Sequence, residues 1–183
     1  DLRAGQSPGR SIHGSCNYLI PHTTMLSYTL AAPVLGMAQG AVDTFEEQVT
    51  GRVTYTTGDK LGENPSVHIR LSEAEAEVHC ARLIMKYDGE EVFGQARRGE
   101  MPSLSQRARC RRNQAYMAKL AVRAVDRLFE ASGGHVLFNS NPMQRFHRDA
   151  HAASHHFGIH WETQAEEYGR VRLGLELKNP GRI

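Results

Sequence analysis

Residues 103–131, SLSQRARCRRNQAYMAKLAVRAVDRLFEA, decide the fold class of this chain. Ser103 and Gln106 form the S-x-x-Q pattern of a capping box, in which each side chain satisfies a backbone N–H of the other at a helix start. Apolar side chains then recur with the period of an α-helix. They are Leu104, Ala108, Ala115, Ala118, Val122, Val125 and Phe129, with Tyr116, Leu120, Ala124 and Leu128 beside them. So wide a stripe predicts a helix buried on more than one side.

The same periodicity predicts further helices on both sides of this one. We expect them at 24–50, 65–93, 142–157 and 162–173. Pro33 should kink the first, and Asn64-Pro65 and Asn141-Pro142 supply a cap and a first-turn proline for two others. The polar link 52–63 is predicted to be a loop. The expected fold is all-α: an antiparallel four-helix bundle with a short extra C-terminal helix, as one domain over 24–183.

Composition excludes several classes of protein. A formal charge of +2 over 183 residues is too small to indicate a nucleic-acid partner. Three cysteines without C-x-x-C spacing are typical of a reduced, cytoplasmic protein. No uninterrupted apolar run approaches the length of a membrane span, so we expect no membrane partner. Residues 1–23 show no periodicity and are interpreted as an irregular lead-in from a preceding domain, either removed or naturally absent.

Five histidines gather near the C-terminal end: His147, His151, His155, His156 and His160. Two i,i+4 pairs among them raise the possibility of a metal site. His147 and His155 would lie roughly 12 Å apart along one helix, however, whereas zinc holds its ligand atoms at about 2 Å. A two-histidine site would need a third ligand, and no H-E-x-x-H motif is present. We therefore predict no metal, with His147 and His151 as exposed helix residues.

Two sets of charged residues, each taken alone, favour a structural role. Arg107, Arg109, Arg111 and Arg112 are typical of a solvated helix face or a salt-bridged subunit contact. Arg145 and Asp149 are spaced i,i+4 and are predicted to pair on a helix surface. Gly133-Gly134 alone indicates no more than the end of a helix.

Together these pieces resemble a known signature. Gly133-Gly134, followed at a distance by PMQRFHRDA over residues 142–150, is similar to the acyl-CoA dehydrogenase pattern. In that family a Gly-Gly turn precedes a helix of the form Pro-x-Glu-Arg-x-x-Arg-Asp-Ala. The helix over 30–52 and the segment Lys60-Leu61-Gly62-x-x-Pro65 also resemble the family, so the similarity extends from about residue 24 to the C-terminal end.

Departures from that pattern indicate the subclass. Common dehydrogenases carry Tyr-Glu-Gly where this chain has His156-Phe157-Gly158, and a phenylalanine cannot act as a base. The segment 142–156 is more similar to the oxygenase components of two-component flavin-dependent monooxygenases, which use reduced flavin and oxygen on aromatic substrates. The ending Tyr168-Gly169-Arg170-x-x-Leu173-Gly174 also resembles that group.

The resemblance implies roles for named residues. His156 matches a histidine beside flavin and substrate, and an imidazole can donate a hydrogen bond and move a proton near neutral pH. Gly133, Gly134 and Ser140 would contact the phosphate of a flavin or a neighbouring subunit's cofactor, with a local helix cap as the alternative for Ser140. Arg148 and Asp149, with Arg145, would hold the helix and a subunit contact.

The resemblance also implies the wider setting. The cofactor would be reduced FMN or FAD, the substrate a small aromatic molecule, and the partner a flavin reductase, with dimers or tetramers of this chain. Two alternatives remain open. A true acyl-CoA dehydrogenase would need a carboxylate elsewhere, for example at Glu46 or Glu47, and a helical oligomerisation module would bind no flavin.

Overall fold

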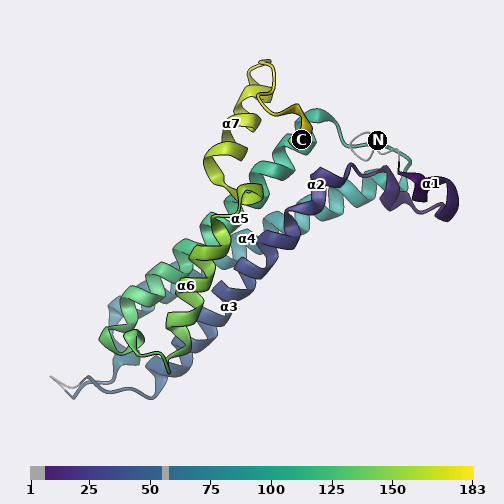
Figure 1. The fold of residues 1–183 in the computed structure, drawn as a ribbon. Coiled ribbons are helices and arrows are strands. Elements are labelled where there is room, and N and C mark those ends of the chain that lie inside the picture. The colour runs from purple at the N-terminus through teal and green to yellow at the C-terminus, as the bar shows by residue number, and fades with distance from the viewer. Residues whose placement is uncertain (1–6, 55–57) are drawn as a thin grey trace. The chain divides into compact units, whose positions relative to one another are not determined.

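The structure, a computed structural model, describes residues 7–54 and 58–183. Its helices are α1 Pro8–His13, α2 His22–Leu26, α3 Tyr28–Thr50, α4 Pro65–Arg97, α5 Leu104–Ser132, α6 Pro142–Ser154 and α7 Trp161–Arg172 (Figure 1). Short 3-10 turns join several of them. Within the described ranges the only β pairing is an isolated bridge between Val53 and Lys60. The all-α prediction is therefore confirmed.

The expected helix starts are present with their side-chain caps. Ser103 Oγ accepts from the Gln106 N–H at 3.3 Å, while Gln106 Oε1 accepts from the Ser103 N–H at 2.9 Å. Asn64 Oδ1 accepts from the Ser66 N–H at 2.9 Å, which caps α4. Asn141 Oδ1 accepts from the Met143 N–H at 3.0 Å, which caps α6. These caps pair backbone donors that a helix start otherwise leaves unpaired.

The boundaries differ from expectation at four places, of which the first is α4, which extends to Arg97 rather than 93. The first long helix is interrupted at Ser27, the C-cap of α2. The fourth ends at Ser154, and a 3-10 turn, η5, covers Phe157–Ile159, because His156 accepts the Gly158 N–H and ends the helical run. The lead-in contains α1 and a 3-10 turn, η2, at Cys16–Leu19. Residues 1–6 of that lead-in lie outside the described ranges.

The described chain divides into two compact units. The first unit holds the chain up to Ala31, Leu83–Met117 and His156–Ile183, and the second holds Ala32–Arg82 and Ala118–His155. Helices α3, α4 and α5 each contribute one segment to each unit.

The second unit is a bundle of four helical segments, from α3, α4, α5 and α6, which lie side by side (Figure 1). Its core holds apolar side chains from all four. They include Val34, Leu35, Ala38, Val42, Phe45, Ala74, Val78, Ala81, Ala121, Ala124, Val125, Leu128, Met143 and Ala150. Burying a side chain such as Phe45 or Leu128 stabilises the fold by about 1.5–3 kcal/mol relative to exposing it. At Gly40 a Cβ would stand 2.7 Å from Cζ of Phe146, so glycine lets that ring approach α3.

The first unit is held by aromatic and polar contacts. Tyr116 of α5 and Trp161 of α7 have ring centroids 5.3 Å apart, and the Arg112 guanidinium lies 4.2 Å from the Tyr168 ring centroid. Buried Glu167 accepts from the Asn179 N–H at 2.8 Å, which ties the C-terminal segment to α7.

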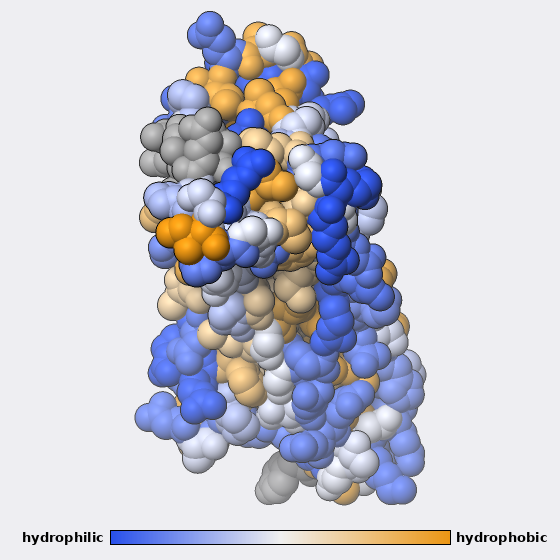
Figure 2. Space-filling model, turned by 90° about the vertical axis from the view of Figure 1, so that its right-hand side faces the viewer, coloured by the Kyte–Doolittle hydropathy of each residue, from blue (hydrophilic) through white to orange (hydrophobic). Residues whose placement is uncertain are grey.

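One face of the molecule is mostly hydrophilic, with hydrophobic residues exposed between polar ones (Figure 2).

The stretch His22–Thr50 meets the length and composition of a membrane span, which differs from the expectation drawn from the sequence. Core helices of bundles meet the same criterion. Val34, Val42 and Phe45 on this stretch are at most 1% exposed. We therefore interpret it as a core helix.

Candidate functional site

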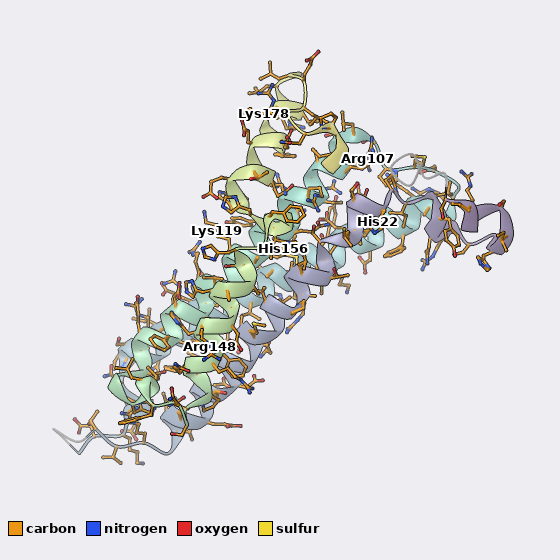
Figure 3. The ribbon with its side chains drawn as sticks, viewed as in Figure 1. His22, Arg107, Lys119, Arg148, His156 and Lys178 are labelled. Carbon is orange, nitrogen blue, oxygen red and sulfur yellow. The ribbon has the colours of Figure 1, made fainter. Side chains whose placement is uncertain are left out.

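His156 lies exposed at the start of η5, in the first unit (Figure 3). Its Nδ1 accepts the Gly158 N–H at 3.1 Å, so in the neutral ring the proton sits on Nε2. That Nε2 makes no hydrogen bond to the residues that the structure describes. The Phe157 ring, 62% exposed, lies beside it with a centroid separation of 4.6 Å. The result is an exposed N–H donor next to an exposed aromatic ring.

The turn that carries His156 is fixed by packing at Gly158. A Cβ there would stand 3.0 Å from Leu30 Cδ1 and 3.2 Å from Ser27 Oγ, so a side chain would push η5 off its support. Ile159 is 2% exposed, and buried Gln164 donates from Nε2 to the Phe157 carbonyl at 3.3 Å. The backbone that follows His156 is therefore held in place.

Polar side chains of α5 contact the end of α2, which is also the segment that packs against Gly158. The buried Arg111 guanidinium donates to Ser27 Oγ, and Gln114 Nε2 donates to the Thr24 carbonyl at 2.6 Å. Both contacts fix the end of α2, against which Gly158 packs. The predicted solvated face is therefore wrong for Arg111, which is 4% exposed.

Asp88 is the centre of a buried network in this unit. Its Oδ2 accepts from Tyr28 Oη at 2.6 Å and Asn113 Nδ2 at 2.8 Å. Arg109 Nε lies 3.3 Å from Asp88 Oδ1 as an ion pair, and its guanidinium also donates to Glu91. Arg109 is thus paired inside the protein rather than solvated, a second correction to the arginine cluster.

This network alters the ionisation of its neighbours. Burial, and then the Asp88 charge, raise the pKa of Tyr28 far above its ordinary value. Burial and Asp88 raise the pKa of the Cys110 thiol to about 12. Although burial opposes it, hydrogen bonding from Arg109 lowers the pKa of Glu91. Tyr28 and Cys110 therefore stay protonated well above neutral pH.

The first unit also contains an open, largely apolar pocket of about 470 Å³. Tyr18, Ile20, Met25, Leu26 and Phe93 line it, and His22 contributes an imidazole. A pocket of this size and polarity suits a small aromatic molecule.

Gly133, Gly134 and Ser140 belong to the second unit, so the structure does not bring them into one unit with His156. Gly133 has φ +74°, which requires glycine where α5 ends, and all three residues are exposed. The cap of α6 is Asn141, so a local cap at Ser140, the alternative drawn from the sequence, is wrong.

Arg52 holds the loop after α5. Its Nη1 donates to the Ser132 carbonyl at 3.0 Å and lies 2.7 Å from His135 Nδ1. Burial and the Arg52 charge lower the pKa of His135. His135 Nε2 lies 3.1 Å from Gln48 Oε1, and Gln48 Nε2 donates to Asn141 Oδ1 at 3.1 Å. The loop is therefore fastened to the end of α3.

Asp149 pairs with its neighbour Arg148 rather than with Arg145, which corrects the predicted i,i+4 pair. The distance from Arg148 Nε to Asp149 Oδ1 is 3.1 Å, and Arg148 and Arg145 are exposed. Glu46 and Glu47, the carboxylates considered for a dehydrogenase, are exposed on α3.

His147 and His151 differ from the exposed residues that the sequence predicted. Both are half-buried, and both Nε2 atoms approach Asp126 Oδ1, at 3.2 and 2.7 Å. Burial, and then His151, lower the pKa of His147, although Asp126 acts in the opposite sense. Sequence reasoning missed Asp126, whose only signal is its position one turn before Phe129 on α5.

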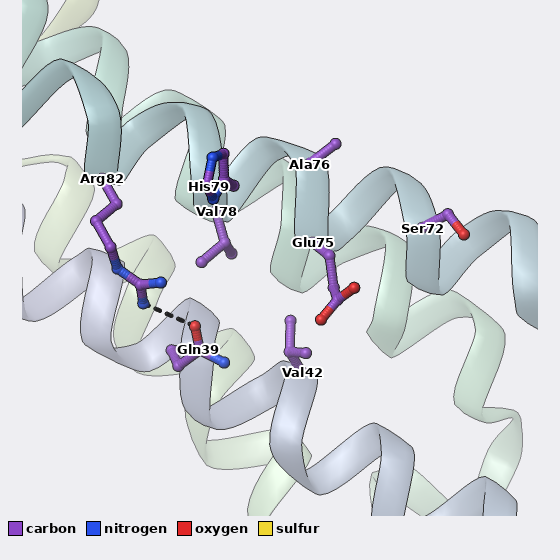
Figure 4. Close-up of a pocket in the computed structure, with 8 residues that line it drawn as sticks. All are labelled: Gln39, Val42, Ser72, Glu75, Ala76, Val78, His79 and Arg82. Carbon is purple, nitrogen blue, oxygen red and sulfur yellow. Dashed lines mark hydrogen bonds between the residues drawn. The ribbon is translucent and has the colours of Figure 1, made fainter.

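An open groove of about 390 Å³ lies between α3 and α4 of the second unit (Figure 4). Arg82 Nη2 donates to Gln39 Oε1 at 2.8 Å across it. Glu75 and His79 lie one helical turn apart on its α4 side. This hydrogen bond links the side chains of α3 and α4 across the groove.

Comparison with protein families identifies one match. The model described as "Acyl-CoA dehydrogenase, C-terminal domain" matches residues 28–161.

Curated relatives and solved structures agree with this match. The chain is 32% identical over 172 residues to the oxygenase subunit HsaA of a flavin-dependent monooxygenase from Rhodococcus jostii, covering 93% of this chain and 45% of that protein. It is 32% identical over 188 residues to the oxygenase component of an FADH(2)-dependent resorcinol hydroxylase from a Rhizobium species, covering 97% and 46%. The crystal structure of the HsaA monooxygenase from M. tuberculosis superposes with a TM-score of 0.86 at 30% identity, covering 96% of this chain and 45% of that one. The chain thus spans less than half the length of these relatives.

Proposed function

This chain belongs to the acyl-CoA dehydrogenase C-terminal domain family, and on that premise we propose that it is the C-terminal helical part of a flavin-dependent monooxygenase. The proposed reaction is hydroxylation of a small aromatic or similar molecule with reduced flavin and oxygen. Relatives that cover most of this chain are oxygenase components of such enzymes, which supports the assignment.

The observation that carries the proposal is the exposed imidazole of His156. Its Nδ1 is held by the Gly158 N–H, so Nε2 presents a donor outward, beside the exposed ring of Phe157. A flat ring with a polar edge matches this pair, since the ring can stack on phenylalanine while its oxygen accepts from Nε2. The residues present therefore fit an aromatic substrate or the edge of a reduced flavin.

The roles follow from this geometry. When bound, reduced flavin would supply the electrons that activate oxygen. His156 would orient the polar edge of the substrate and hold or return a proton at Nε2. Gly133, Gly134 and Ser140 would contact cofactor phosphate, here or in a neighbouring subunit, because their exposed backbone leaves room for a close approach. Arg145, Arg148 and Asp149 would form a subunit contact.

The proposed setting completes the assignment. The cofactor would be reduced FMN or FAD, delivered in the cytoplasm by a separate flavin reductase, and the oxygenase would assemble as a dimer or tetramer. Leu137 and Phe138, 70% and 67% exposed in the loop after α5, are the kind of apolar surface that such an assembly covers.

The test uses the complete enzyme that contains this chain. Enzyme loaded with reduced flavin is mixed rapidly with oxygenated buffer and a phenol, and near-ultraviolet absorbance and hydroxylated product are followed. The His156→Asn variant is informative, because asparagine can still cap η5 but lacks the imidazole. We expect its hydroxylation rate to fall about 100-fold or more, the usual size of a lost acid–base group.

His155→Ala is the matched control, since His155 is the exposed neighbour, and it should leave hydroxylation unchanged. Bleaching of bound flavin by an acyl-CoA, without any oxygen-dependent transient, would place the enzyme among the dehydrogenases instead. A complete protein that binds no flavin would favour a helical assembly module.

A further inference from the structure

Asp126, His147 and His151 form a cluster in the second unit that the proposed reaction does not use. The two histidines are spaced one turn apart on α6, and Asp126 comes from α5. All three candidate ligand atoms lie within 4.8 Å of one another. The third ligand that a pair of histidines on one helix lacks is therefore supplied by the neighbouring helix.

The distances are close to those around a metal ion. Tetrahedral zinc with ligands at about 2.0–2.1 Å places neighbouring ligand atoms roughly 3.3 Å apart. Here the Nε2 atoms of His147 and His151 lie 3.2 and 2.7 Å from Asp126 Oδ1. Both histidine-to-aspartate distances are thus near the spacing of a coordination shell, and the two imidazole nitrogens, which lie within 4.8 Å of each other, would reach that spacing by side-chain rotation.

The ligands are also oriented by their surroundings. The Phe129 ring stacks on His147 with centroids 4.1 Å apart and an interplanar angle of 25°. Arg123 and Arg127, the cations that flank Asp126 on α5, both bind Glu77 on α4. Because both guanidinium groups bind Glu77 on another helix, they do not compete with the imidazoles for Asp126. The Asp126 carboxylate contacts the two imidazoles instead.

Donor type indicates which ions would bind. Two imidazole nitrogens and one carboxylate oxygen suit zinc, cobalt and nickel, whereas magnesium and calcium prefer an all-oxygen shell. The three side chains are between 33% and 38% exposed, which leaves the outer side of the cluster open to water. Each Nε2 would carry a lone pair after its proton moves to Nδ1, a change that the neutral ring makes through solvent.

We propose that Asp126, His147 and His151 bind one divalent ion of the zinc class, with water completing its coordination, and that the ion links α5 to α6. The site is separate from the function proposed for His156, so either assignment can fail without the other.

Cobalt(II) is the probe, because its visible bands report coordination number and ligand type. The 183-residue chain, freed of metal with a chelator, is titrated with cobalt chloride, and zinc is then added to displace it. We expect one cobalt per chain, bands typical of four or five ligands, and no thiolate charge-transfer band. His147→Ala, His151→Ala and Asp126→Asn should each weaken binding more than about tenfold.

Two controls separate this site from other donors. His155→Ala, at the C-cap of the same helix, and Cys80→Ser, at an exposed thiol, should both retain the bands and the stoichiometry. Circular dichroism shows whether each variant keeps its helices. Absence of stoichiometric binding, or equal binding by the wild type and all three ligand variants, would overturn the proposal.

Discussion

Two aspartates show how differently this chain uses a carboxylate. Asp88, in the first unit, is 0% exposed and is bound by Tyr28, Asn113 and Arg109. Asp126, in the second, is 37% exposed and faces two imidazoles. Taking a charge out of water is costly, and a buried carboxylate persists only when donors surround it. A half-exposed carboxylate can exchange partners, which is what a ligand site requires.

The largest loss of stability should follow removal of the buried aspartate, Asp88. Asp88→Ala leaves Tyr28 Oη and Asn113 Nδ2 without their acceptor and removes one of the two acidic partners of Arg109. We expect the free energy of unfolding to fall by about 3 kcal/mol, near the lower end for breaking a buried pair, because Glu91 remains. Denaturant unfolding of the variant measures this. A loss below about 1 kcal/mol would show that water reaches the network and would remove the contrast with Asp126.

A smaller and pH-dependent effect is expected at Tyr28. Tyr28→Phe removes a hydrogen bond to a charged acceptor, and we expect a loss of about 1.5 kcal/mol at neutral pH. The pKa of Tyr28 is raised in the folded state, so above about pH 10 only the unfolded chain releases this proton, and stability falls as the pH rises. The Cys110 thiol, with a pKa of about 12, adds a loss that begins near pH 8.5.

The measurement for this prediction is unfolding free energy between neutral and alkaline pH in wild type and variant. Tyr28→Phe should remove the part of the decline that starts near pH 10 and keep the part due to Cys110. Parallel curves for the two proteins would mean that the Tyr28 hydroxyl ionises as readily in the folded chain as in the unfolded one.

The smallest effect should appear at the exposed aspartate. In metal-free chain at neutral pH, Asp126→Ala should cost less than about 1 kcal/mol, because water can replace the hydrogen bonds of a carboxylate that is 37% exposed. Denaturant unfolding at neutral pH, compared with that of the wild type, measures this difference. A loss as large as that of Asp88→Ala would assign Asp126 a structural role rather than a ligand-binding one.

Helices and caps could be predicted from sequence because their causes are local. The capping box of Ser103 and Gln106, the caps at Asn64 and Asn141, and the apolar period of α5 act within a few residues. Boundaries at Ser27 and His156 could not, because the Ser27 hydroxyl is bound by the distant Arg111, and the His156 side chain competes with the helix for a backbone N–H. The roles proposed for Gly133, Gly134, Ser140 and His156 rest on family resemblance.

By itself the sequence determined the class of fold and the family, since periodicity, caps and a spaced motif are properties of neighbouring residues. Only the tertiary structure decided which distant side chains meet. Tyr28 reaches Asp88 across 60 positions, and Asp126 meets His151 across 25. The physical reason is that helix rotation and register depend on how whole apolar faces pack. A shift of one residue turns a side chain by about 100°, enough to exchange a buried partner for water.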